Sequence, residues 1–505
     1  MTNEPCDTPG RRNHTVQGRL KTTFRALTVR NYRLFASGQL VSLLGNWMQV
    51  TAQDWLVLKL SHNSPSALGL VTALQFTPVL LLTLLGGKLA DRFDKRRILM
   101  VTQSCYAVLA TVMGVLVVSG SIELWMVFCF AAAWGTCGAL DTPARQSFVS
   151  EMVGRDLLPN ALSLNSAVFN GARIIGPAIG GVTIALFGTG TAFVVNAFTF
   201  IAPLVALTRM VPAQLHRDLA ARAKAGEAHI TDGFRYVRHR RDLAIPMILI
   251  LIAGLFAFNF SVTLPVLAKN VFHRGAGEFG LLSTFLAVGA LSGALAGSAR
   301  KGRPSTWLVT GAAVLFGLLE TILGMSPSFL LTLALLVPTG FAMIFFAQAA
   351  NQRVQMGTEA VVRGRVMALY VLVFMGTTPI GAPVVGWVGE TFGPRTSIWA
   401  GGAVTLVAAI VVFALEQRRH GVRLRLDRDQ MRLTVRPRVP LDAVLPGESA
   451  AAADALATAA PSAAGADAVA ADALATVEPA IPIEPAIPIE PGASIEPEPA
   501  LQRAS

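Results

Sequence analysis

Long apolar stretches recur along most of this chain and are separated by short polar segments. A helix needs roughly 20 apolar residues to cross about 30 Å of hydrocarbon. Twelve stretches have about this length, and each is predicted to be a helix because backbone groups in lipid must be hydrogen-bonded within their own segment. The predicted membrane helices cover residues 35–58, 67–87, 98–120, 124–142, 163–187, 191–208, 244–268, 279–298, 306–325, 328–348, 366–388 and 397–415.

The composition agrees with a membrane protein and not with soluble domains. Hydrophobic residues make up 53% of the chain and charged residues 14%, and the mean hydropathy is +0.55. The formal net charge of +12 would suggest a nucleic-acid partner for a soluble protein. Here, however, the connections on one side of the predicted helices carry 36 Lys and Arg residues, and those on the other side carry 4. This asymmetry predicts a multi-pass protein of the cytoplasmic membrane with both termini in the cytoplasm and no nucleic-acid partner.

The order of these segments predicts an all-α membrane protein with two bundles of six helices. The expected parts are a basic N-terminal segment, the first bundle, a cytoplasmic central loop, the second bundle and a cytoplasmic tail, over residues 1–34, 35–208, 209–243, 244–415 and 416–505. The tail is rich in Ala, Pro and Glu and is expected to be disordered. Within the central loop, the end near the second bundle has an apolar face among basic residues, which is typical of either an interfacial helix or a solvated tether.

An internal repeat supports the two bundles. When the chain is shifted by about 205 residues, six identities align the fifth predicted helix with the eleventh. They pair Phe169, Gly171, Gly176, Gly181, Phe187 and Gly188 with Phe374, Gly376, Gly381, Gly386, Phe392 and Gly393. Parallel repeats of this kind build transporters whose substrate site lies between two rocking bundles near the middle of the membrane.

The connection between the second and third predicted helices carries a pattern with a mechanical interpretation. Gly87 would allow two helices to approach closely, and Asp91 followed by Arg92 lies at the cytoplasmic rim. There the carboxylate can accept hydrogen bonds from the first N–H groups of a neighbouring helix, which makes a latch. A basic loop that only sets orientation would explain Lys95 and Arg96 but not the Asp-Arg pair after glycine.

The fifth predicted helix contains small residues and a proline that favour a bend and tight packing. They are Gly176, Pro177, Gly180 and Gly181. The alternative is ordinary packing of small residues without a transport role.

Arg173 lies in the same helix, about eleven residues from its start, where a charge costs roughly 2.5–3.5 kcal/mol on insertion scales. It is about 60° from Gly176 around the helix, so it is expected to face protein and not lipid. The sequence leaves open a static role beside Pro177 or a role in binding a substrate or anion.

Polar residues of the first predicted helix fall on one stripe. Ser42, Asn46, Gln49 and Gln53 lie within about 60° of arc and are expected to line a central cavity. Asp54 is the only carboxylate of this helix and is the first candidate for a proton carrier, because burial makes a carboxyl group easier to protonate. Glu320 in the ninth helix is the second candidate, although its place there also suits a structural role.

The chain carries no motif that indicates an enzyme. No phosphate-binding loop of the Gly-x4-Gly-Lys-Ser/Thr type and no His/Cys cluster with metal-ligand spacing is present in the sequence. We therefore expect no catalytic residues, no metal and no cofactor. Energy for transport would come from a gradient, with protons and a small molecule as the partners.

The segment Gly86–Arg97 resembles motif A of the major facilitator superfamily, and the glycines around Pro177 resemble motif C of its antiporters. Residues 48–58 and 141–149 look like the branch that contains the enterobactin exporter and macrolide efflux proteins. The resemblance implies a twelve-helix monomer that exports bulky amphiphiles by alternating access, commonly with proton antiport. It also implies that Asp91 meets the backbone near Val366 and Arg145. One departure is Asp94, where the family has glycine.

Other functions remain compatible with the sequence. An uptake carrier or uniporter would use the same helices, and variants of Asp54 and Glu320 that keep pH-dependent transport would argue against proton coupling at these sites. A non-transporting membrane receptor or assembly factor would need neither the polar stripe of the first helix nor the Asp-Arg pair at Asp91. Both features therefore favour a transporter.

Overall fold

The computed structural model describes residues 24–216, 230–300, 302–359, 362–420, 423–427 and 432–436. The chain falls into two units, residues 1–421 and 422–505. The described part of the second unit is an antiparallel hairpin of strands β1 (Arg423–Asp427) and β2 (Arg432–Arg436). Of the tail expected at 416–505, residues 416–420 belong to α16 and residues 423–427 and 432–436 to the hairpin. The rest of the tail, most of the basic segment 1–34 and part of the central loop lie outside the described residues.

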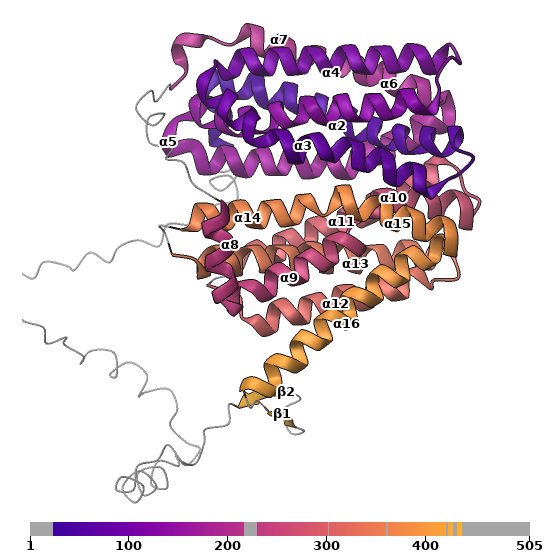
Figure 1. Cartoon of the computed structure of the whole chain (residues 1–505). Helices are drawn as coiled ribbons and strands as arrows, with labels where there is room; N and C mark the ends of the chain where they lie inside the picture. The colour runs from indigo at the N-terminus through magenta and orange to yellow at the C-terminus, as the bar shows by residue number, and fades with distance from the viewer. Residues whose placement is uncertain are drawn as a thin grey trace, which may run out of the picture. The chain divides into compact units, whose positions relative to one another are not determined.

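The first half of the large unit is a bundle of long helices (Figure 1). Its helices follow a short 3-10 turn, η1 (Arg25–Thr28). They are α2 (Arg30–Leu60), α3 (Pro65–Arg92), α4 (Lys95–Val118), α5 (Leu124–Phe187), α6 (Thr189–Thr199) and α7 (Ile201–Arg209), followed by the turn η2 (Pro212–Gln214). Helix α5 contains two membrane spans, because Gly154 takes a left-handed φ of 70° and reverses the chain there. Glycine tolerates this conformation because it has no Cβ.

The second half repeats the arrangement, with breaks at different places. An amphipathic helix, α8 (Ile230–His239), precedes it and confirms a helix where the central loop was expected to hold either a helix or a tether. The remaining elements are α9 (Arg241–Phe256), α10 (Phe260–Val266), the π-helical turn η4 (Leu267–Val271), α11 (Ala276–Ser298), α12 (Thr306–Gly324), α13 (Phe329–Gly357), α14 (Arg363–Gly376), α15 (Thr378–Phe392) and α16 (Pro394–His420).

The predicted membrane helices are found at all twelve positions. Eleven spans within the described ranges are long and apolar enough to cross a membrane. The remaining predicted span is α2, which has 31 residues and is long enough to cross. Its polar stripe lowers its mean hydropathy, and this explains why α2 is the least apolar of the set. An all-α membrane fold is therefore confirmed for the large unit.

The internal repeat is visible in the way equivalent glycines pack. A Cβ atom on Gly181 of α5 would press on the backbone of Ala276 in α11, and one on Gly386 of α15 would press on the backbone of Pro65 in α3. Each bundle thus offers a glycine to the other bundle from the equivalent helix. Both helices end at a glycine in the left-handed region, with φ of 83° at Gly188 and 96° at Gly393. Such close approach between helices is what small residues permit in a membrane.

The bundles have two ends. We call one the basic end, after its charged residues, and the other the apposed end, because the two bundles contact each other near it. The basic end carries the starts of α2, α9, α12 and α14 and the turns near Asp94 and Gly154. The apposed end carries the turns at residues 61–64, 119–123, 272–275 and 325–328. The two bundles pack against each other in the half near the apposed end, where α3 packs along α15 and α5 along α11.

Hydrogen bonds between the bundles also lie in the apposed half. Glu390 accepts hydrogen bonds from Ser64 Oγ at 2.5 Å and from the backbone N–H of Ser66 at 3.0 Å. Asn270 Nδ2 donates to the carbonyl of Asn63 at 3.0 Å. The structure therefore shows a transporter-like pair of bundles that is closed at the apposed end.

Candidate functional site: a polar cavity in the first bundle

A cavity of about 410 Å³ lies in the half of the first bundle near the basic end. It is lined by residues of α2, α4 and both spans of α5, and by Phe200 at the junction of α6 and α7. Its walls combine amide, hydroxyl and charged groups with aromatic rings, and they are formed by Gln39, Ser42, Leu43, Asn46, Gln103, Tyr106, Trp134, Asp141, Thr142, Arg145, Gln146, Leu162, Asn165, Ser166, Phe169 and Phe200. A concave site with a few convergent polar groups is the usual form of a small-molecule binding site.

The polar stripe of α2 divides between two roles. Ser42 and Asn46 line this cavity of the first bundle. Gln49 and Gln53 are not among the residues that line it. Asn196 Nδ2 donates to Gln49 Oε1 at 2.6 Å, and Gln53 Nε2 donates to Gln75 Oε1 at 3.3 Å. The two residues of the stripe nearer the apposed end therefore join α2 to α6 and α3, because buried amides in lipid need hydrogen-bond partners.

An ion pair in the first span of α5 forms the charged wall of the cavity. Arg145 donates to Asp141 Oδ2 from Nε at 2.8 Å and from NH2 at 2.5 Å. The other oxygen, Asp141 Oδ1, accepts from Thr102 Oγ1 at 2.8 Å and from Gln103 Nε2 at 2.9 Å. Both oxygens of this buried carboxylate are thus bound by donors, which offsets the cost of burying its charge.

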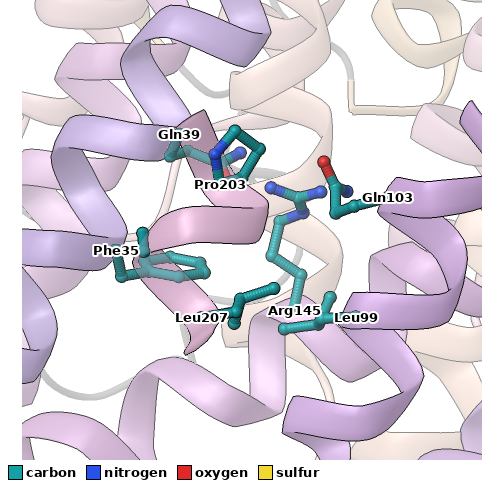
Figure 2. Close-up of a pocket in the computed structure, with 8 residues that line it drawn as sticks. Phe35, Gln39, Leu99, Gln103, Arg145, Pro203 and Leu207 are labelled. Carbon is teal, nitrogen blue, oxygen red and sulfur yellow. The ribbon is translucent and has the colours of Figure 1, made fainter. Parts of the chain in front are cut away.

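Arg145 was expected to meet Asp91, and the structure places it elsewhere. Figure 2 shows its guanidinium group between the amide groups of Gln39 and Gln103. The sequence interpretation missed Thr102, Gln103 and the role of Asp141. The spacing of Asp141 and Arg145 could have indicated their pairing, because residues four apart are neighbours on a helix. Thr102 and Gln103 gave no such signal, since they approach from another helix.

Aromatic rings form the apolar side of the cavity. Tyr106 and Trp134 have ring centroids 4.4 Å apart, and Tyr106 stacks on Phe200 at 5.6 Å. On the α5 side, Phe169 lines the cavity and meets the edge of Trp47 at 5.9 Å. Rigid rings of this kind offer a large contact area to an amphiphile.

The last turns of α3 pack differently from the prediction. A Cβ atom on Gly86 would collide with the carbonyl of Ala139, whereas no atom lies within 4 Å of a Cβ built on Gly87. The close helix approach is therefore made by Gly86, and its assignment to Gly87 was wrong. Asp91 and Arg92 are exposed at the basic end.

The basic residues that follow hold the first bundle together. Lys95 forms an ion pair with Glu151 of α5. Arg96 donates from Nε to the carbonyl of Leu207 at 2.6 Å and from NH2 to that of Thr208 at 3.1 Å. A cation at the last carbonyls of α7 satisfies groups that have no partner within the helix. These side chains therefore have structural contacts within the bundle in this state.

In the second bundle, Asp242 pairs with arginines of the connections at the basic end. Arg303 NH2 donates to Asp242 Oδ2 at 2.7 Å, and Arg240 donates to both oxygens of Asp242 at 3.0 Å. The hydrogen bonds to Asp242 raise the pKa of Arg240 above its ordinary value. Residues 299–305, which hold the corresponding place in the second bundle, contain no acidic residue, and their Arg303 pairs with Asp242 in the first turn of α9. The contacts at the basic end therefore differ between the two bundles.

The glycines around Pro177 pack on two neighbours at once. Gly176 and Gly180 face α2, where a Cβ atom would press on Trp47 or on the backbone of Met48. Pro177 and Gly181 face α11, where the carbonyl of Pro177 lies against Gly280. The predicted tight packing is therefore present, and it joins the first bundle to the second.

Two comparisons of sequence place this chain among known proteins. The family model described as transmembrane secretion effector matches residues 21–432. The chain belongs to this family of major facilitator transporters. The Staphyloferrin A transporter of Staphylococcus aureus is 30% identical over 266 residues, which are 51% of this chain and 64% of that protein. The multidrug efflux pump Tap of Mycolicibacterium fortuitum is 28% identical over 398 residues, which are 76% of this chain and 95% of Tap.

Solved structures agree on the fold. A variant of the nucleoside transporter NupG superposes with a TM-score of 0.62 at 14% identity and covers 77% of this chain and 99% of NupG. At such low identity the likeness shows the major facilitator fold alone. The predicted resemblance to the major facilitator superfamily is confirmed by the family match, and the chain is a membrane transporter of this family.

The two acids that the sequence predicts as proton carriers, Asp54 and Glu320, are not among the residues that line the cavity. Asp54 is buried near the apposed end of α2. Glu320 is buried in α12 of the second bundle, and its Oε2 atom has no hydrogen-bond partner among the described residues. A third buried acid, Asp141, lines the cavity. Among the described residues, no cluster of three His, Cys, Asp or Glu side chains that could hold a metal is found.

Proposed function

We propose that this transporter exports small amphiphilic molecules, such as drugs, macrolides or siderophore-like compounds, across the cytoplasmic membrane. The observation that carries the proposal is the polar and aromatic cavity in the basic half of bundles that are closed at the apposed end. The excess of Lys and Arg at the basic end supports a cytoplasmic location for that end. A substrate would then enter from the cytoplasm in this state.

Export would proceed by alternating access, in which the bundles rock about the cavity. Glycines at the interface between the bundles suit this motion. Helices that contact through glycine have no interlocking side chains there, so the contact can open and close again. In the opposite state the basic end would close, and Asp91 would meet the N-terminus of α14 near Val366. Exposure of Asp91 here agrees with a latch that is open while the cavity faces the basic end.

Proton antiport would supply the energy, with an intramembrane acid as the carrier. Asp54 and Glu320 are the candidates predicted from the sequence, and we add Asp141 and rank it first because it lines the cavity. A proton on Asp141 would weaken its bonds to Arg145 and change the charge of the substrate site. Proton and substrate would thus compete for one site, which is the requirement for exchange.

The direction of transport can be tested in everted membrane vesicles that contain this chain. They are offered a panel of siderophores, macrolides and dyes while the internal pH is recorded. We expect at least one amphiphile to accumulate inside energised vesicles and to raise the internal pH as protons leave. An uptake carrier would instead release a preloaded compound from the same vesicles.

Asp91→Asn is expected to lower export by about tenfold or more, which corresponds to about 1.4 kcal/mol. The amide carries no charge to stabilise the N–H groups at the start of α14 in the state closed at the basic end. The measurement is the export rate at matched protein levels in the membrane. Lys88→Gln is the control, because Lys88 is exposed on the same segment. Unchanged export in Asp91→Asn would exclude the latch.

Asp54→Asn and Glu320→Gln separate the three candidate carriers. Since neither side chain lines the cavity, we expect each variant to retain the dependence of export on pH. The loss in rate is expected to stay below about tenfold. Export is measured between pH 5.5 and 8.5 in vesicles of equal protein content. A pH profile that becomes flat in either variant would make that residue the carrier in place of Asp141.

A further inference from the structure

Arg173 has an unusual position in the second span of α5. It lies between the face that packs on α2 and the face that packs on α11, about 60° from Gly176 and about 40° from Pro177 around the helix. Ile175 and Ile179 are exposed and mark the lipid side of α5, away from Arg173. The side chain is therefore directed toward the space between the bundles. It lies one turn beyond Phe169, which lines the cavity.

No acidic side chain in the described part of the chain pairs with Arg173. Its guanidinium lies over the ring of Trp47, 5.9 Å from the centroid. Among the described residues we find no ion pair and no hydrogen bond from Arg173 to a carboxylate or to a carbonyl beside Pro177. Asp141 is occupied by Arg145. Asp54 follows Trp47 by two helical turns, about 10 Å further along α2. A cation inside a membrane protein normally has a partner or serves a ligand or ion pathway.

Trp47 adds a second donor at the same place. Its Nε1 atom is buried and has no hydrogen-bond partner among the described residues. Gly176 leaves room for the Trp47 side chain, and Phe169 meets the edge of its ring. An indole N–H inside a protein usually finds an acceptor. Two donors without acceptors among the described residues thus lie together behind Phe169, which separates them from the cavity that it lines.

The walls of the cavity itself hold acceptors without donors. Gln39 Oε1, Asn46 Oδ1 and Gln103 Oε1 are buried and have no partner among the described residues. The orientation of Gln103 is fixed, because its amide nitrogen donates to Asp141. Its oxygen therefore has to act as an acceptor. A ligand that satisfies both sets must carry an anionic acceptor at one end and hydroxyl or amine donors at the other.

We propose that the cavity binds amphiphilic carboxylates, whose anionic group pairs with Arg173 and Trp47 Nε1 while a hydroxyl or amine group donates to Gln103 Oε1. The inference rests on the proposed function, because it names the substrate class of the same site. The apolar body of the ligand lies against Phe169, Tyr106 and Trp134. A planar guanidinium suits a carboxylate because it can donate two parallel hydrogen bonds.

The test is a binding titration with two probes that differ only in charge. The probes are 11-(dansylamino)undecanoic acid and its methyl ester, and the full chain is held in lipid nanodiscs. Dansyl fluorescence reports the dissociation constant for the wild type and for Arg173→Gln, Arg173→Lys and Arg274→Gln. Arg274 is the matched control, because its guanidinium also lies over an aromatic ring, 5.8 Å from the centroid of Phe329.

We expect Arg173→Gln to weaken binding of the acid by about tenfold or more and binding of the ester by less than about twofold. Arg173→Lys keeps the charge and is expected to lose less than Arg173→Gln. Arg274→Gln is expected to bind both probes as the wild type does. Equal loss for both probes would assign Arg173 a structural role, and failure of the wild type to prefer the acid would contradict the inference.

Transport of the same probes in everted vesicles separates this inference from the proposed function. If both probes are exported at equal rates, export stands and the carboxylate preference is wrong. If the wild type binds the acid selectively and exports neither probe nor any compound of the panel, the binding site stands and the proposed export is wrong.

Discussion

Asp141→Asn is expected to lower export by about tenfold or more and to flatten its dependence on pH. The substitution keeps the shape of the side chain and removes both its charge and its protonation. Arg145 would then remain in the cavity without its acidic partner, and Thr102 and Gln103 would donate to a weaker acceptor. Removal of one member of a buried pair is costly because the other charge stays uncompensated. The measurement is the initial rate of export in everted vesicles between pH 5.5 and 8.5.

A double variant distinguishes coupling from folding. Asp141→Asn combined with Arg145→Gln removes both charges and is expected to restore the amount of protein in the membrane without restoring pH-dependent export. Asp242→Asn serves as the matched control, since Asp242 also accepts from two arginines but lies in the second bundle, away from the cavity. If Asp141→Asn exports with the pH profile of the wild type, Asp141 is not the carrier.

Gly386→Val is expected to abolish most transport by keeping the apposed end from closing. A Cβ atom at this position would lie 2.6 Å from the carbonyl oxygen of Pro65 and 3.1 Å from the Cα of Ser66. Both are backbone atoms of the other bundle, so the contact can be relieved only if the bundles separate. Overpacking of this kind costs about 1–3 kcal/mol, which shifts a two-state equilibrium by about fivefold to more than a hundredfold.

The shift can be measured with a cysteine reporter. Ser166 lines the cavity, and Ser166→Cys in a background without other cysteines can be labelled from the basic end by a membrane-impermeant maleimide. We expect labelling to fall by about fivefold or more in Gly386→Val. Gly311→Val is the control, because a Cβ built on Gly311 has no neighbour within 4 Å. Undiminished labelling in Gly386→Val would show that this glycine contact does not set the state of the cavity.

The course of the chain through the membrane was predictable from the sequence because it depends on local properties. Apolar length fixes where helices cross, and the distribution of Lys and Arg indicates their orientation. The repeat at about 205 residues also indicated the equivalent packing of Gly181 and Gly386, which the structure confirms. Each of these features can be read without knowledge of a neighbouring helix.

The site was harder to predict because it depends on which helix covers which face. Gln49 belongs to the polar stripe of α2, but it accepts a hydrogen bond from Asn196, which lies 147 residues away in the chain. Gly86 and Gly87 are adjacent and point about 100° apart on the helix, so only the position of Ala139 decides which of them is at the contact. Similarly, Arg145 had two possible acidic partners, and the one four residues away forms the pair.

Purified protein in liposomes offers the most direct test of secondary export. Liposomes are loaded with buffer and given a pH gradient alone, acidic inside, with an amphiphile from the vesicle panel at equal concentration on both sides. For the fraction of protein whose basic end faces outward, we expect the amphiphile to accumulate inside and the internal pH to rise, and both signals to disappear in Asp141→Asn. Accumulation without any pH gradient, or a gradient that moves no substrate in either direction, would contradict proton-coupled export.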